Sequence, residues 1–229
     1  MTLPISEVFG PTLQGEGPHA GRTVQFIRLG GCNLSCSWCD TPYTWDASRF
    51  NLRQELTPMA VQEILDRIIP GVPIVLSGGE PLLHQDSDEL HELLWTARRM
   101  GCRIHVETNG TIAPNSRMLG QVDVWAVSPK MAHAGEHKRT QDPTPWDGWP
   151  RVTAAFLKVV VQSRQDVLQV ASQAHEAGWS PERVWVMPLG TSTADLLEIW
   201  PDIASAAASV WINATQRLHV LAWGDTKGT

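Results

Sequence analysis

Short apolar runs alternate with amphipathic stretches along most of the chain. Six runs have the length and composition of buried strands: residues 23–29, 72–76, 103–107, 122–127, 155–161 and 183–187. Helical spacing of apolar residues predicts helices that start at Thr57–Pro58 and cover residues 86–100, 165–177 and 193–209, the last interrupted at Pro201. Strands that alternate with helices are typical of βα units around a parallel sheet.

Six such units predict an α/β fold, a partial, modified (β/α)6 barrel of the TIM-like type rather than a complete eight-stranded one. No repeat or linker interrupts the pattern, so we expect a single domain over residues 1–229. Residues 1–22 are rich in Gly and Pro and are expected to form an irregular lead-in. Residues 131–150 are polar and carry three prolines, which favours a lid or partner-contact segment, with Trp146 and Trp149 as contacts.

Composition narrows the class of protein. Of the 229 residues 42% are apolar and 18% are charged, and the net charge is −6, which excludes a disordered chain and gives no general attraction for nucleic acid. No stretch approaches the roughly 20 apolar residues of a membrane span. The first residues lack the basic-then-apolar pattern of a signal peptide, so we expect a cytoplasmic protein.

Three of the four cysteines, Cys32, Cys36 and Cys39, lie within eight residues, whereas Cys102 stands apart and is expected to do no chemistry. This is too few and too clustered for a disulfide framework. A zinc site would need a fourth ligand, such as a distant His19. A four-iron cluster on three cysteines leaves one iron open for a small molecule, and the C-x3-C-x2-C spacing favours this alternative.

Polar and glycine-rich segments follow several predicted strands, where parallel α/β folds place their chemistry. These segments are Ser77–Pro81, Glu107–Gly110, Ser128–Lys130 and Met187–Pro188. Two successive glycines in the first segment let a ligand approach the backbone closely, and the carboxylate after them suits an ammonium group.

Other candidates lie outside these strand ends. Gln14 and Glu16 face one side of an extended chain and can pair with the amino-pyrimidinone edge of a pterin or guanine. Arg28 suits two parallel bonds to a carboxylate. Asp40 and Thr41 offer the hard oxygen ligands that Mg²⁺ prefers, although a capping threonine is the simpler interpretation.

The cysteine motif, with Trp38 just before its last cysteine, resembles that of the radical S-adenosylmethionine (SAM) superfamily. The resemblance implies the shortened barrel of that superfamily and a [4Fe–4S] cluster whose open iron chelates SAM. One electron from the cluster then cleaves the sulfonium and releases a 5′-deoxyadenosyl radical. Gly78, Gly79 and Glu80 resemble the superfamily motif that holds the SAM amino group.

The motifs together, from Leu13–Gly17 to Leu218–His219, resemble the 7-carboxy-7-deazaguanine synthases in order along the chain. The resemblance implies Mg²⁺-dependent ring contraction of 6-carboxy-5,6,7,8-tetrahydropterin, with loss of ammonia, in queuosine and other 7-deazapurine biosynthesis. It implies a homodimer that receives electrons from flavodoxin or ferredoxin.

The same resemblance implies roles for individual residues. Cys32, Cys36 and Cys39 would hold the cluster, with Arg28 and Thr41 also catalytic, and Thr41 with Asp40 would bind Mg²⁺. Substrate contacts would be Leu13, Gln14, Gly15, Glu16, Arg28, Ser77, His219 and Thr229. SAM contacts would be Trp38, Gly78, Gly79, Glu80, Glu107, Asn109, Ser128, Pro129, Lys130, Met187 and Pro188.

Three positions depart from the family pattern. Met187–Gly190 stands where Gln-Pro and an acid are frequent, Arg217 stands where Gln is common, and Ser77 replaces a frequent Thr. Two alternatives remain at this stage: a small radical SAM activating enzyme of the glycyl-radical activase type, and a zinc-stabilised binding module.

Overall fold

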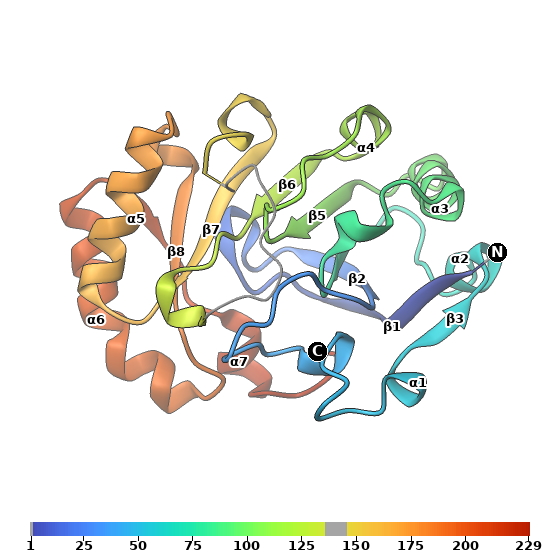
Figure 1. Ribbon diagram of the computed structural model, residues 1–229, viewed down its shortest axis with the longest axis horizontal. Helices are drawn as coiled ribbons and strands as arrows, with labels where there is room; N and C mark the ends of the chain where they lie inside the picture. Colours follow the sequence, from blue (N-terminus) through green and yellow to red (C-terminus); the bar gives the residue numbers. More distant parts are fainter. Residues whose placement is uncertain (1, 136–145) are drawn as a thin grey trace.

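A computed structural model describes residues 2–135 and 146–229. Its strands are β1 (Leu3–Leu13), β2 (Thr23–Leu29), β3 (Thr57–Met59), β4 (Ile74–Gly78), β5 (Ile104–Thr108), β6 (Val124–Val127), β7 (Ala155–Val161), β8 (Val184–Pro188) and β9 (Asn213–Ala214). Within the described residues they form one nine-stranded sheet in the order β3-β1-β2-β4-β5-β6-β7-β8-β9 (Figure 1).

The six predicted strands are confirmed as β2, β4, β5, β6, β7 and β8, and each pairs with the next in parallel. Most residues of β4, β6, β7 and β8 are buried, in keeping with the continuous apolar runs of their sequences. In β7 every residue from Ala155 to Val161 is buried. The predicted partial barrel is therefore present, with extra strands at both edges.

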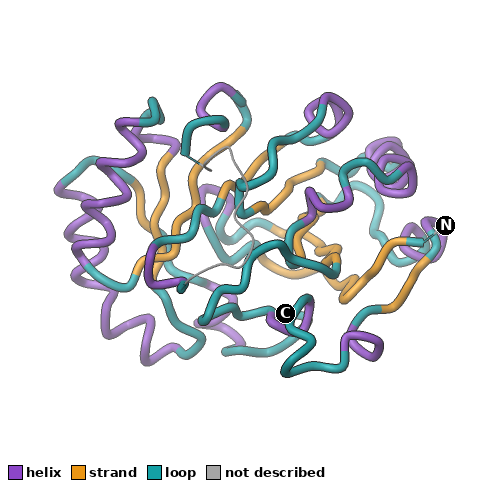
Figure 2. Tube along the Cα trace, in the orientation of Figure 1, coloured by secondary structure: helices purple, strands orange, loops and turns teal. Residues whose placement is uncertain are grey.

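Helices cover the outer face of the curled sheet. An arc around the strands is formed by α2 (Val61–Leu65), α3 (Asp88–Arg99), α4 (Ser116–Gln121), α5 (Arg164–Glu176) and α6 (Thr193–Ser209) (Figures 1 and 2). Two further helices, α1 (Leu52–Glu55) and α7 (Leu218–Trp223), lie away from this arc. Ser87, Ser163 and Ser192 cap α3, α5 and α6 by accepting a backbone N–H three residues on.

The main core fills the space between the sheet and this arc. Leu90, Leu93 and Leu94 of α3 are fully buried against Ile74 and Leu76 of β4. Burial of this kind stabilises the fold by about 2 kcal/mol for each large side chain. Because the helices occupy the outer face, the inner face and the carboxyl ends of the strands are left for the site.

The lead-in prediction was wrong. Residues 3–13 form β1, which pairs antiparallel with β2 and carries two register shifts. Thr57 and Pro58 do not start a helix: they lie in β3 at the sheet edge, where Pro58 pairs with Pro4. An edge strand tolerates proline because one side of it needs no ladder hydrogen bonds. Helix α2 starts later, and the Glu63 carboxylate accepts the Ala60 N–H at 2.7 Å.

Two further expectations need correction. Helix α6 continues through Pro201 without a break. Trp149 is not a partner contact, because it is 2% exposed, lies 5.3 Å from the Trp125 ring and donates from Nε1 to the Gly110 carbonyl at 2.9 Å. Trp146 also packs against the core. The rest of the predicted lid, residues 136–145, lies outside the described residues. In the described parts of the chain, no helix has the length and apolarity that a membrane crossing requires.

A buried histidine on β5 predicts how the fold responds to acid. Burial, together with the nearby His19 and Arg103, lowers the pKa of His105 to about 4. An unfolded histidine titrates near pH 6.5, so between pH 6.5 and 4 the unfolded chain takes up a proton that the folded chain does not. We expect His105 to remove about 3 kcal/mol of stability over this range.

Denaturant unfolding at pH 7 and pH 4 checks this. On acidification the free energy of unfolding of His105→Gln should fall by about 3 kcal/mol less than that of the wild type. That of His175→Gln, a change on the exposed surface of α5, should fall as much as that of the wild type. Equal acid losses in all three proteins would contradict the assignment.

Candidate active site

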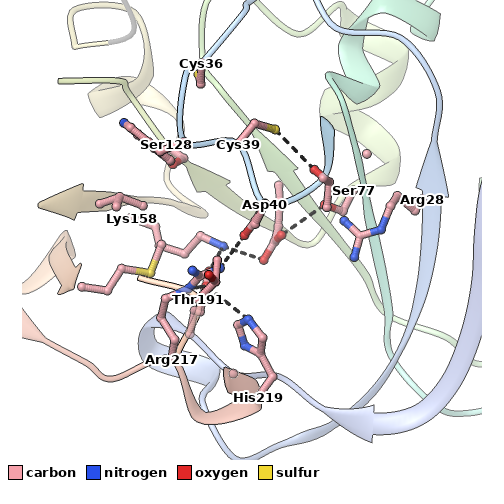
Figure 3. A pocket seen from close by; sticks show the side chains of 18 of the residues that line it. Arg28, Cys36, Cys39, Asp40, Ser77, Ser128, Lys158, Thr191, Arg217 and His219 are labelled. Atoms are coloured by element: carbon pink, nitrogen blue, oxygen red, sulfur yellow. Dashed lines mark hydrogen bonds and ion pairs between the residues drawn. The ribbon is translucent and has the colours of Figure 1, made fainter. Parts of the chain in front are cut away.

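A cavity of about 570 Å³ lies at the carboxyl ends of the parallel strands. The structure brings almost all of the predicted site residues to its wall: Leu13, Gln14, Gly15, Glu16, Arg28, Cys32, Cys36, Trp38, Cys39, Asp40, Thr41, Ser77, Gly78, Gly79, Glu107, Asn109, Ser128, Lys130, Met187, His219 and Thr229. Glu80, Pro129 and Pro188 are not part of that wall. Residues from both ends of the chain thus surround one space (Figure 3).

The three clustered cysteines come from the loop after β2 and are free thiols on the cavity wall. Burial raises the pKa of the Cys32 thiol to about 12 and also raises that of Cys36. Thiolates at these positions therefore need a strong cationic partner, and iron supplies one.

The three thiols can be compared with the two metal sites that the sequence leaves open. A single zinc ion needs four ligands around one centre, whereas in a four-iron cluster each of three cysteines binds a different iron. Among the described residues, no three His, Cys, Asp or Glu side chains form a group that could hold one metal ion. His19, the possible fourth zinc ligand, lies instead against His105, with ring centroids 4.9 Å apart.

The two glycines after β4 bring this cysteine loop close to the sheet. A Cβ on Gly79 would stand 2.0 Å from the Gly31 carbonyl oxygen. The Gly79 N–H donates to Leu29 at 3.1 Å, and the Glu80 N–H donates to Gly31 at 2.8 Å. The glycines therefore fix the base of the cysteine loop as well as one wall of the cavity.

Glu80 lies behind the cavity wall rather than on it. Its side chain is fully buried and accepts three hydrogen bonds: from Leu82 N at 2.9 Å, from Thr108 Oγ1 at 2.8 Å and from Asn109 N at 2.7 Å. Burial outweighs these bonds and raises the pKa of this carboxyl group. The geometry thus gives Glu80 a buried position under the Glu107–Asn109 strand end, and its contact with SAM stays a prediction.

The proposed SAM side of the cavity is lined by Trp38 and the end of β6. The Lys130 ammonium lies 5.5 Å from the Trp38 ring centroid and donates to Ser128 Oγ at 2.9 Å. Met187 lines the cavity nearby, but Pro129 and Pro188 do not. This side offers an aromatic surface, a hydroxyl group and a cation.

A buried lysine joins two carboxylates on the opposite side. Lys158 Nζ lies 2.7 Å from Glu16 Oε2 and 2.7 Å from Glu107 Oε1. Ser77 Oγ donates to the other oxygen of Glu107 at 3.2 Å, and Gln14 Nε2 donates to Glu107 Oε1 at 3.3 Å. Lys158 was not among the predicted site residues, although a lysine inside an apolar strand was the available signal.

Glu16 stays ionised despite its depth. Burial by itself would raise the pKa of this carboxyl, but the charges of Lys158 and Arg217 bring the pKa well below its usual value. Arg217 Nε donates to Glu16 Oε1 at 2.8 Å. A carboxylate held from both oxygens in this way is a fixed acceptor for a ligand N–H.

His219 and the chain end complete this wall. His219 packs so closely on the lead-in that a Cβ on Gly15 would come within 2.0 Å of His219 Nδ1. Burial lowers the pKa of His219, so the imidazole is neutral near pH 7. The Leu218 N–H donates to Gly15 at 2.9 Å, and Thr229 also lines the cavity.

Arg28 stands across the cavity from Lys158 (Figure 3). Its Nε donates to Glu7 Oε2 at 2.7 Å, and the Tyr43 hydroxyl donates to the same oxygen at 2.9 Å. The guanidinium carbon lies 5.9 Å from the Phe9 ring, which stacks on Phe26. These contacts set the direction of the guanidinium, and the two rings add an apolar wall that the sequence did not indicate.

The two predicted Mg²⁺ ligands have different surroundings. The Asp40 carboxylate is paired with the Arg217 guanidinium, whereas the Thr41 hydroxyl lies 3.7 Å from Cys39 Sγ. Burial acts to raise the pKa of Asp40, but Arg217 keeps it below its usual value. Asp40 is the more exposed of the two oxygen ligands, with 42% of its side chain accessible, but its carboxylate is already engaged by Arg217.

Comparison with known proteins agrees with this geometry. Residues 26–199 match the model of the radical SAM superfamily. A 7-carboxy-7-deazaguanine synthase of Pyrobaculum aerophilum is 35% identical over 98% of this chain and 96% of its own. The chain belongs to the 7-carboxy-7-deazaguanine synthase family. A second member of that family, from Hyperthermus butylicus, is 34% identical over 96% of this chain and 92% of its own.

The fold has a solved counterpart. The crystal structure of QueE from Escherichia coli matches with a TM-score of 0.65 at 22% identity and covers 96% of this chain and 95% of its own. Membership of the radical SAM superfamily brings with it a four-iron cluster and SAM as cofactors. The three cavity-facing thiols and the adjoining aromatic and cationic wall fit these two groups.

Proposed function

We propose that the chain is a 7-carboxy-7-deazaguanine synthase, which contracts the ring of 6-carboxy-5,6,7,8-tetrahydropterin to 7-carboxy-7-deazaguanine and releases ammonia. One observation carries this proposal: the three-cysteine loop opens onto the same cavity as a fixed carboxylate, an amide and an arginine that suit a carboxylated pterin. The relatives from Pyrobaculum aerophilum and Hyperthermus butylicus bear this activity in their names.

The two sides of the cavity would bind different groups, the cluster with SAM on one side and the pterin on the other. Cys32, Cys36 and Cys39 would hold the cluster, and Ser128 and Lys130 would meet SAM beside Trp38. When bound, the cluster and SAM supply a carbon-centred radical. The protein's own contribution is to hold the pterin at a fixed distance from that radical, because an unconstrained radical attacks whatever lies nearby.

The pterin side recognises charge and hydrogen-bonding pattern. Glu16 would accept the N–H groups of the amino-pyrimidinone edge, next to the Gln14 amide, whose Oε1 already accepts the Glu16 N–H at 3.2 Å. Arg28, oriented by Glu7, would form two parallel bonds with the substrate carboxylate. The neutral His219 stands against Glu16 and can accept a proton.

Thr41 is the proposed protein ligand of Mg²⁺, and its removal gives a testable result. Thr41→Ala should keep the cluster and its ability to cleave SAM but lose the product formation that depends on Mg²⁺, because the hydroxyl oxygen that binds the ion would be gone. Thr41→Ser, which keeps that oxygen, is the control. Titration of turnover with Mg²⁺ measures the effect, and an unchanged Mg²⁺ response in Thr41→Ala would count against the role.

The partners of the enzyme follow from the same proposal. Flavodoxin or ferredoxin would deliver the electron, and the chain would work as a homodimer in the cytoplasm. The alternative function is that of an activating enzyme of the glycyl-radical type. Such an enzyme shares the cysteine spacing but acts on a protein, so it would not need the Gln14–Glu16 wall.

Product analysis with the carboxylated pterin as substrate distinguishes the deazaguanine synthase from the activating enzyme. With reduced, cluster-loaded protein we expect 6-carboxy-5,6,7,8-tetrahydropterin to yield the deazaguanine. Cleavage of SAM with no deazaguanine from the pterin would overturn the proposal, and one zinc per chain without iron or sulfide would overturn the radical chemistry altogether.

A further inference from the structure

Arg217 is among the most constrained side chains of the site. It is 6% exposed and sits just before α7. Its Nε donates to Glu16 Oε1 at 2.8 Å, one terminal nitrogen donates to the Gly190 carbonyl at 2.7 Å, and the other pairs with Asp40. All three nitrogens of the guanidinium are thus engaged.

The three acceptors belong to separate segments of the cavity wall. Glu16 follows β1 and lies two residues beyond Gln14. Asp40 lies between Cys39 and Thr41, in the loop that carries the cysteines. Gly190 follows β8. One planar group therefore connects the pterin side of the cavity to the loop that carries the cysteines and to the end of the sheet.

Arg217 and Gly190 join two segments of the wall that are far apart along the chain, the start of α7 and the end of β8. These two residues are hydrogen-bonded to each other. A glutamine amide has two N–H donors and no charge, so it cannot satisfy three separate acceptors, two of which are carboxylates.

Charge balance supports the same arrangement. Glu16 would retain Lys158 without Arg217, with Nζ 2.7 Å from Oε2, but Asp40 would lose its guanidinium partner. The substrate-side carboxylate would then have one fixed oxygen instead of two. Asp40 would be free to move with the cysteine loop.

We propose that Arg217 is a positioning residue. Its guanidinium holds the Glu16 segment and the Asp40 loop at a fixed separation, so that the bound pterin stays at a constant distance from the radical source. The inference rests on the proposed function. It assigns to Arg217 no contact with the reacting atoms. Its effect passes through Glu16 on the substrate side and through Asp40 on the cluster side.

Three measurements on cluster-loaded protein test this: the Kd of the product 7-carboxy-7-deazaguanine, the 5′-deoxyadenosine released per deazaguanine formed, and the melting temperature. For Arg217→Gln we expect deazaguanine formation to fall about 100-fold, while SAM cleavage stays within about threefold of the wild type. Released 5′-deoxyadenosine per product should rise accordingly, and the product should bind about tenfold more weakly. Arg217→Lys keeps the positive charge but loses the planar set of donors, so its values should lie between those of the wild type and of Arg217→Gln. This variant replaces Arg217→Gln in the test if the glutamine variant does not fold.

Arg183→Gln is the matched control. Arg183 also donates from all three nitrogens, to Ala155, Pro150 and Val152 carbonyls at 2.7–3.0 Å, but it lies away from the cavity. The Arg183→Gln variant should have a lower melting temperature, with the product Kd and the amount of 5′-deoxyadenosine released per deazaguanine unchanged. If the Arg217 variants behave in the same way, the positioning role is overturned. If the wild type itself makes no deazaguanine, the proposed function fails instead, which is a distinct outcome.

Discussion

Cys36→Ala is expected to abolish deazaguanine formation. Cys36 is 8% exposed and packs with Leu34 and Ala134 at the centre of the cysteine loop, where the Ser37 N–H donates to Ala134 at 3.0 Å. With one thiolate removed, two cysteines cannot hold a cluster that keeps a single open iron. Iron and sulfide content, the brown absorbance of the cluster and product formation should fall together, the last to below detection.

Cys102→Ala provides the matched control for that loss. Cys102 is also buried and free, but it lies at the other end of the sheet, where Sγ is 3.9 Å from Gln25 Nε2 and 3.6 Å from the Ile69 carbonyl oxygen. We expect full iron content and activity, with a stability loss of about 1 kcal/mol for the small cavity. A Cys36→Ala enzyme that retains its cluster and turnover would contradict the assignment of the cysteine loop.

Lys158→Met is expected to have the second largest effect, on both stability and turnover. The ammonium is 5% exposed and neutralises Glu16 and Glu107 together. Its removal leaves Glu107, which is 19% exposed, without its cation, which costs about 3 kcal/mol, the lower end for a broken buried pair. For a chain of this length that corresponds to a fall in melting temperature of about 10 °C. Turnover should fall as well, because Glu16 and Glu107 would repel each other across the substrate wall.

Two comparisons test the cause of this loss. Lys158→Met/Glu107→Gln removes the unpaired charge and should recover part of the stability. Lys227→Met breaks an exposed pair with Glu55, 2.9 Å long, and should cost less than about 1 kcal/mol. A fall of only a few degrees for Lys158→Met, equal to that of Lys227→Met, would contradict the account.

The parallel part of the fold and the rim of the cavity could be predicted from the sequence because each depends on local pattern. A parallel strand is buried on both faces, so its apolar run is visible, and ligand groups follow it at the carboxyl end. Ser77, Glu107 and Ser128 were found in this way, and the structure brings them to one cavity.

The rest depends on contacts between distant parts of the chain. β1 contains Gly10 and Pro11 and gains its place by pairing with β2, so no local pattern marks it. Thr57–Pro58 has the composition of a helix start but is held in an edge strand by Pro4. The pairing of Lys158 with Glu16, or of Arg217 with Asp40, spans more than a hundred residues and becomes visible only in the folded chain.

The most direct test of the central claim is the stoichiometry of one reaction. Reduced, cluster-loaded protein is incubated with SAM, Mg²⁺ and 6-carboxy-5,6,7,8-tetrahydropterin, and the pterin consumed, the 7-carboxy-7-deazaguanine formed and the ammonia released are measured together. We expect equal amounts of all three with the wild-type protein, and none of the deazaguanine or ammonia with Cys36→Ala. Pterin that remains unchanged while the wild-type protein cleaves SAM would contradict it.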